Sequence, residues 1–178
     1  MKVSLIAALS RNGVIGTGDG GIPWDLPRDR DRFRSFTAGK HLLLGRVTYE
    51  EMEGWFSDHT PLVLTRDETF DAPVGRVVHR VEEAVTVTAE EGAAELCVCG
   101  GASVYEASLP YVDELVLTRV ETDIEGTVKF PDFESGAEWE TISEEFHPAD
   151  DENSRPMTFL VLRRLHPSSL RPARMHWL

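Results

Sequence analysis

The sequence predicts an α/β fold in a single domain, with a mainly parallel central sheet of about eight strands flanked by about four helices. Two observations predict this fold. Short apolar runs alternate with helical segments along the chain, as in strands joined by helical crossovers. The 178 residues can bury one sizeable core, and no linker divides them. We expect one domain over 1–165 and a loosely ordered C-terminal tail at 166–178.

The first half of the chain is expected to hold three strands, a glycine-rich loop and two helices. VSLIAAL (3–9) is a continuous apolar run, which is typical of a strand buried on both faces. GVIGTGDGGIP (13–23) contains too many glycines for a regular element. A helix is expected after Pro27, because proline suits a first helical turn. Further strands are expected at 40–45 and 61–66, with a helix starting at 46.

The second half is expected to repeat this alternation and then to end in two strands. Strands are expected at 76–79, 95–101 and 113–121, with helical segments at 81–93 and 102–109. The last two strands, WETISEEF (139–146) and MTFLVLRRL (157–165), are expected to form an antiparallel pair.

Composition excludes several classes of partner. The formal net charge of −13 argues against nucleic acid and against an anionic membrane surface, since both need a basic footprint. No apolar run is long enough for a membrane span, and the apolar start lacks the features of a signal peptide.

Cys97 and Cys99 are expected to be reduced, as in a cytoplasmic protein. No His or Cys cluster has the spacing of a metal site.

A nucleotide cleft is expected where the parallel strands end, because ligands of such folds bind beyond these carboxyl ends. Free N–H groups at a helix start attract phosphate, and Arg46 and Thr48 stand at one such start. Thr65 and Arg66 end the neighbouring strand and could meet the same phosphate. The alternative is a solvent-facing Arg46 and a helix-capping Thr48. Neither a GxGxxG nor a Walker motif is present.

Asp29 is the candidate for acid chemistry. Asp29, Phe33 and Phe36 follow i, i+4, i+7 spacing and would share one apolar helix face. A lone carboxylate there is expected to have a raised pKa, which suits a proton donor or a ligand anchor. The alternative is an acid that answers the helix dipole in the first turn. The other charged residues of this helix are expected to face mostly away: Arg28, Arg30, Asp31, Arg32 and Arg34.

The ordered set of motifs resembles the dihydrofolate reductase family over about residues 1–165. The motifs are SLIAAL, NGVIG, GIPWDLPRDRDRF, GRVTYE, LVLTRD, CGGASVY, LVLTRVE and EGTVKFPDF. The resemblance implies a dihydrofolate reductase-like fold and transfer of hydride from NADPH to C6 of 7,8-dihydrofolate, with protonation at N5. The product would be tetrahydrofolate, which serves one-carbon metabolism. It also implies a monomer that needs no metal.

The resemblance implies roles for the residues of the substrate side. Asp29 would hold the pterin 2-amino group and N3 and promote protonation of N5 through water that Trp24 helps to order. Thr118 would hydrogen-bond the Asp29 carboxylate. The remaining pterin-pocket walls would be Ile6, Ala8 and Phe33.

On the cofactor side, the resemblance implies contacts in four groups. The nicotinamide would lie near Ala8, Ile15 and Gly16, under a mobile lid formed by 13–23. Phosphate contacts would come from Arg46 and Thr48, and 2′-phosphate contacts from Thr65 and Arg66. A peptide bond that is typically cis would join Gly100 to Gly101. Further contacts would come from Ser103 and Tyr105.

Three positions depart from the family pattern. His59 stands where the family has the Arg that holds the folate α-carboxylate, and Arg30 is a possible replacement. Thr127 stands where many relatives have an Asp that pairs with the lid. His59 and Trp55 motivate an alternative function, reduction of another heterocycle such as the aminouracil ribosyl phosphate of riboflavin synthesis. A non-catalytic nucleotide-binding domain is disfavoured by the presence of Asp29.

Overall fold

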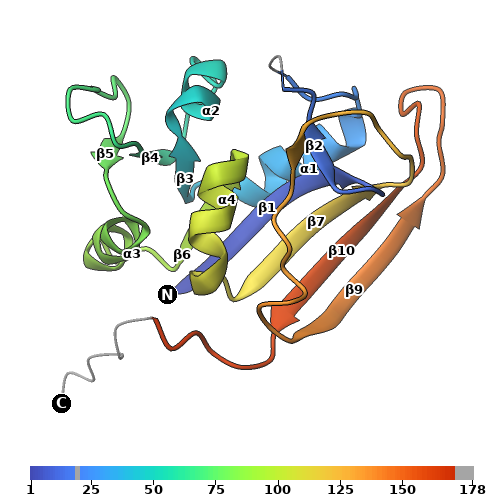
Figure 1. Ribbon diagram of the computed structural model, residues 1–178. Coiled ribbons are helices and arrows are strands. Elements are labelled where there is room, and N and C mark those ends of the chain that lie inside the picture. Colours follow the sequence, from blue (N-terminus) through green and yellow to red (C-terminus); the bar gives the residue numbers. More distant parts are fainter. Residues whose placement is uncertain (19–20, 171–178) are drawn as a thin grey trace.

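The computed structural model describes residues 1–18 and 21–170, and its main feature is one large sheet (Figure 1). In this part of the chain, eight strands form the sheet in the order β5-β4-β3-β6-β1-β7-β10-β9. All neighbours pair in parallel except β7 with β10 and β10 with β9, so the predicted sheet is confirmed. The strands are β1 (Lys2–Ser10), β3 (His41–Gly45), β4 (Thr60–Leu64), β5 (Arg76–Val78), β6 (Glu95–Gly100), β7 (Glu114–Val120), β9 (Trp139–His147) and β10 (Met157–Arg164).

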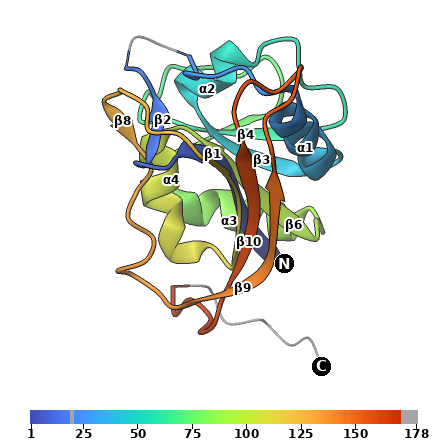
Figure 2. The same ribbon diagram turned by 90° about the vertical axis from the view of Figure 1, so that its right-hand side faces the viewer.

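Helices cover both faces of this sheet. They are α1 (Pro27–Thr37), α2 (Arg46–Glu51), α3 (Val81–Glu90) and α4 (Ala102–Ser108), followed by a 3-10 turn, η1 (Leu109–Tyr111), which was not predicted. Figure 2 shows α1 and α4 on opposite sides of the sheet, with β9 and β10 nearest the viewer. Among the described residues, no helix is long and apolar enough to cross a membrane.

β1 separates two apolar layers. Its side chains alternate, so that Leu5 packs in a core with residues of α3 and α4, whereas Ile6 packs in a second core on the α1 side. Phe33 and Phe36 of α1 lie against this second core. Because β1 pairs with β6 on one side and β7 on the other, both its faces and both its edges are covered. This placement explains the unbroken apolar run of the sequence.

The glycine-rich segment is partly regular, which corrects the expectation for 13–23. Val14–Gly16 forms β2, which pairs antiparallel with β8 (Val128–Lys129) in a small second sheet. The Phe130 N–H also donates to the Gly13 carbonyl at 2.8 Å, and the Thr127 hydroxyl donates to the Thr17 carbonyl at 3.3 Å. Long-range pairing thus orders this segment. Residues 19–20 of the segment, and 171–178 of the expected tail, lie outside the described residues.

The start of α1 is capped by a distant loop. Leu26 occupies the N-cap position and its side chain forms no capping hydrogen bond. Instead, the Arg28 N–H donates to the side-chain oxygen of Asn153 at 3.0 Å, from the loop between β9 and β10. Asn153 is 2% exposed, and its own N–H groups donate to Asp150. These bonds and Arg28 depress the pKa of Asp150 to about 2. The loop therefore fixes the turn of helix that carries Asp29.

We predict that Asn153→Ala lowers the free energy of unfolding by about 1–2 kcal/mol, because it removes a helix cap and leaves a backbone N–H without its partner. Urea unfolding followed by circular dichroism measures this. Glu152→Ala, a change at an exposed residue of the same loop, is the matched control and should change stability by less than about 0.5 kcal/mol. Equal losses in the two variants would show that the cap contributes nothing specific.

Candidate active site

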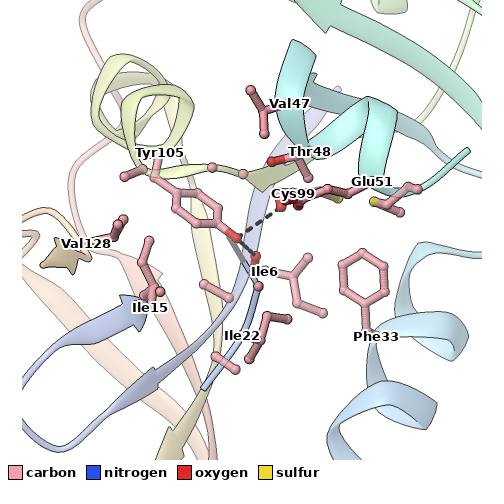
Figure 3. Close-up of a pocket in the computed structure, with 18 of the residues that line it drawn as sticks. Ile6, Ile15, Ile22, Phe33, Val47, Thr48, Glu51, Cys99, Tyr105 and Val128 are labelled. Carbon is pink, nitrogen blue, oxygen red and sulfur yellow. Dashed lines mark hydrogen bonds between the residues drawn. The ribbon is translucent and has the colours of Figure 1, made fainter. Parts of the chain in front are cut away.

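A cavity of about 980 Å³ opens at the carboxyl ends of β1, β3 and β6 (Figure 3). Most of its lining is apolar or glycine, and it includes Ile6, Ile15, Ile22, Phe33 and Val128. The location agrees with the cleft expected from the strand pattern. Of the sequence-predicted residues, Ala8, Gly16, Asp29, Thr48, Gly100, Gly101 and Tyr105 also line the cavity.

Asp29 is the acid of this cavity. It lies in the first turn of α1, and Thr118 on β7 is close enough to influence its pKa by hydrogen bonding. Burial raises the pKa of Asp29, while the bond from Thr118 and the positive charges of Arg32 and Arg30 oppose this rise. The acid thus lies at a helix start and also lines a largely apolar cavity, a position that fits both interpretations of the sequence. A buried carboxylate of this kind can anchor a cationic or N–H-rich ring.

Arg32 does not face away from the sheet, contrary to the expectation from its charge. Its Nη1 donates to the Leu117 carbonyl at 2.7 Å and to the Thr118 hydroxyl oxygen at 3.0 Å. Its guanidinium carbon lies 4.3 Å from the centre of the Phe159 ring. Position 32 follows Asp29 by three residues, so both side chains lie on one side of the helix. Unlike Arg32, both Arg30 and Arg34 line the cavity.

Trp24 and Thr118 lie behind the cavity wall rather than in it. Thr118 is 1% exposed, and Trp24 packs against the small core of Leu26, Val120 and Met157. The Trp24 Nε1 is buried and has no hydrogen-bond partner among the described residues. An indole N–H in this position can donate to a water molecule beside the ring site.

One wall of the cavity was anticipated only in part, because the sequence predicted Thr48 as a site residue but not Glu51 or Met52. Thr48, Glu51, Met52 and Trp55 line the cavity from α2 and the turn after it. They follow i, i+3, i+4, i+7 spacing, the pattern that identified the α1 face, so the signal was present in the sequence. The Trp55 ring lies 5.4 Å from that of Phe33 across this end of the cavity. Cys99 and Val47 are further lining residues that were missed.

At the opposite end, backbone rather than side chain forms the wall. The peptide bond between Gly100 and Gly101 is cis, as expected, and Gly100 has a φ of 113°. A Cβ at Gly100 would lie 3.0 Å from the Tyr105 hydroxyl. That hydroxyl donates to the carbonyls of Ile6 and Cys99, at 2.8 and 3.1 Å (Figure 3). Tyr105 thus ties β1, β6 and α4 together beneath a surface that a flat ligand can approach.

The predicted phosphate residues do not all meet in the cavity. Arg46, Thr65 and Arg66 do not line it. Arg46 forms an ion pair with Glu50 at 3.5 Å. The pKa of Asp67 is lowered mainly by hydrogen bonds from Thr69 and to a smaller extent by the charge of Arg46. The start of α2 therefore lies near the loop after β4, as expected. Ser103 lines a separate hollow between α4 and the segment after β8.

His59 does not reach the cavity either. Its ring stacks on Trp55 with 4.5 Å between centres, and its side chain is only 6% exposed. Of the residues that the structure describes, the charged ones that line the cavity besides Asp29 are Arg30 and Arg34, from α1, and Glu51 and Glu53. Arg30 is paired with Asp25. Within the described part of the chain, Arg34 forms no ion pair, which leaves its guanidinium available to a ligand carboxylate.

The thiol and metal chemistry of the site is limited. Cys97 and Cys99 are free and buried, with 3.7 Å between their sulfur atoms. Burial raises the pKa of the Cys99 thiol well above its ordinary value, so the thiolate that a nucleophile needs is disfavoured. In 1–18 and 21–170, no group of three or more His, Cys, Asp or Glu side chains is arranged to hold a metal ion.

Comparison with known proteins agrees with this geometry. The chain matches the dihydrofolate reductase family model over residues 2–164. It is 34% identical to the type 3 dihydrofolate reductase of Salmonella typhimurium and to the dihydrofolate reductase of Haemophilus influenzae, each over 92% of this chain and 99% of the relative. A solved dihydrofolate reductase from Enterococcus faecalis, complexed with NADP(H) and RAB-propyl, has a TM-score of 0.82 at 29% identity, covering 93% of this chain and 97% of that one. By sequence and by fold, this chain belongs to the dihydrofolate reductase family.

Proposed function

We propose that this protein reduces 7,8-dihydrofolate to 5,6,7,8-tetrahydrofolate with NADPH. The observation that carries the proposal is a partly buried acid, Asp29, whose pKa burial raises and hydrogen bonding with Thr118 lowers, at the wall of a largely apolar cavity. A pterin ring has this complementary character, with a flat apolar face and an edge of N–H donors. Ile6, Ala8 and Phe33 would pack against the faces of the ring.

Asp29 would bind the pterin ring, and Trp24 would position the water that protonates it. The Asp29 carboxylate would accept hydrogen bonds from the 2-amino group and N3 of the pterin, which fixes the ring in the cavity. The Trp24 N–H would hold a water molecule that delivers a proton to N5. Hydride addition at C6 together with this proton completes the reduction of the C6–N5 double bond. The apolar walls exclude other water, which strengthens these polar contacts.

The opposite half of the cavity fits a nicotinamide dinucleotide. Ala8, Ile15 and Gly16 would border the nicotinamide, and the exposed backbone of Gly100 and Gly101 lets a ligand approach closely. When bound, NADPH supplies the hydride for C6. Thr48 would contact a phosphate from inside the cavity. Arg46, Thr65 and Arg66 would act from outside it, on the phosphates and the adenosine 2′-phosphate, and Ser103 and Tyr105 would complete the site.

We further propose that the protein acts as a monomer. Outer strand β9 is exposed along nearly its whole length and carries Glu140, Glu144 and Glu145. Such charges oppose pairing with the edge of another sheet.

We predict that Asp29→Asn lowers kcat with dihydrofolate by roughly 10²–10⁴-fold at neutral pH while NADPH affinity stays nearly unchanged. Absorbance of NADPH follows turnover, and fluorescence titration gives the affinity. Asp31→Asn, at an exposed acid of the same helix, is the control and should retain turnover. Equal turnover of Asp29→Asn and the wild type would exclude Asp29 from the reaction. If the wild type bound NADPH but left dihydrofolate unreduced, the substrate would be another heterocycle.

We predict that Asp29→Asn is more stable than the wild type at pH 7. The pKa of Asp29 is raised above 3.8 in the folded state, so its ionisation opposes folding. This cost is absent below the unfolded-state pKa and complete above the folded-state pKa. The stability gain of Asp29→Asn should therefore grow as the pH rises from 4 to 7, as measured by urea unfolding at each pH. A gain that is independent of pH, or the same in Asp31→Asn, would contradict this assignment.

The tail of the substrate should be held from α1. We predict that Arg34→Met raises the KM for dihydrofolate about 10-fold, because a charge-assisted hydrogen bond to the glutamate carboxylate is lost. The KM for dihydropteroate, which lacks the glutamate, should not change. His59→Gln is the control, since His59 lies outside the cavity. If the KM for dihydrofolate rose in His59→Gln but not in Arg34→Met, the glutamate carboxylate would be bound near His59 and not by Arg34.

A further inference from the structure

A line of three side chains joins the acid of the cavity to a partly buried cation. Arg32 donates to the oxygen of the Thr118 hydroxyl at 3.0 Å. Hydrogen bonding with the same hydroxyl is the largest of the causes that lower the pKa of Asp29, followed by the charge of Arg32. Because the Thr118 oxygen accepts from Arg32, its own hydrogen is left to donate to Asp29. The second bond of Arg32 Nη1, to the Leu117 carbonyl at 2.7 Å, anchors the guanidinium to β7. Both ends of the line are carried by the first two turns of α1.

The guanidinium is held between several charged and aromatic groups. From α1 it faces Asp29, whose charge also interacts with Arg30. The charge of Glu145 on β9 also acts on the guanidinium. The Phe159 ring of β10 lies against the guanidinium, and His147 at the end of β9 packs against this ring. Tyr105 of α4 is a neutral phenol, because burial chiefly, and the charge of Asp29 to a smaller extent, raise its pKa well above its ordinary value. An arginine stays cationic in such surroundings.

We propose that Arg32 is a positioning residue for Asp29: it directs the Thr118 hydroxyl at the carboxylate and supplies the positive charge that balances Asp29 in the apolar cavity. The expected effect of Arg32 on turnover rests on the proposed function. The link between Arg32 and Asp29 does not depend on the substrate. Arg32 itself does not line the cavity. It therefore acts through Thr118 and not by touching the pterin.

The direct test is the titration of Asp29 in the free protein. Carbon-13 NMR of aspartate-labelled protein, with Asp29→Asn to assign the signal, gives the midpoint for wild type, Arg32→Met, Arg32→Gln and Arg32→Lys. Loss of the cation in Arg32→Met should move the midpoint to higher pH by about one pH unit. Arg32→Gln, which keeps hydrogen-bond donors without charge, should move it in the same direction. Arg32→Lys should restore most of the wild-type value.

A matched control separates this role from a general loss of charge. Arg28→Met removes another cation from the same helix, one that pairs with Asp150 at 2.7 Å, and should leave the Asp29 midpoint unchanged. The Arg32→Met shift should also appear in the pH dependence of single-turnover NADPH oxidation and vanish there in the Asp29→Asn background. If Arg32→Met does not fold, Arg32→Gln carries the same test.

Two results would overturn the proposal. One is an unchanged Asp29 midpoint in folded Arg32→Met or Arg32→Gln, with a loss of thermal stability only, which would make Arg32 a packing residue. The other is an equal shift in Arg28→Met. Failure of the wild type to reduce dihydrofolate would instead count against the proposed function, since the titration of Asp29 can be measured without any substrate.

Discussion

Burial of β1 on all sides is the constraint on which the rest of the structure depends. Its backbone groups pair with β6 and β7, and its side chains enter the cores on both faces. A strand in this position has no exposed length except where it ends. The neighbouring parallel strands end at the same level, so the ends of β1, β3 and β6 bring backbone and small side chains to the wall of the cavity. The cavity is thus a product of the sheet order.

The negative charge of Asp29 in this cavity needs stabilisation, and Thr118 and Arg32, which do not line the cavity, provide part of it. Asp29 gains one hydrogen bond from Thr118 and the fields of two arginines, yet burial still dominates its pKa. The result is an acid that is supported but not neutralised by a direct ion pair. A bidentate pair with an arginine would occupy the oxygens that a ligand needs. Bonding through a hydroxyl leaves the carboxylate edge open to the cavity.

Regular periodicity predicted most of the fold and part of the cavity lining, and the family resemblance supplied most of the other expected site residues. Asp29 and Phe33 were recognisable because their spacing put them on one helix face, and the strand ends located Thr48 and Gly100. The β2–β8 pair was missed because three-residue strands have no periodicity, and their pairing joins segments more than 100 residues apart. Arg32 was misplaced because charge was taken as a sign of exposure, although its stem and guanidinium can lie on an aromatic ring. Asn153 could not be assigned, since a cap from a remote loop leaves no local pattern.

The Asn153 cap has a consequence for how motion is shared in the molecule. The helix turn that carries Asp29 begins on a bond to the hairpin loop between β9 and β10, 125 residues further along the chain. Opening of this hairpin loop therefore releases the first turn of α1, and ordering of that turn by a ligand must in return restrain the loop. Amide exchange in the hairpin, at a distance from the cavity, would then report occupancy of the cavity. Thermodynamic linkage requires this reciprocity without any change in the sheet itself.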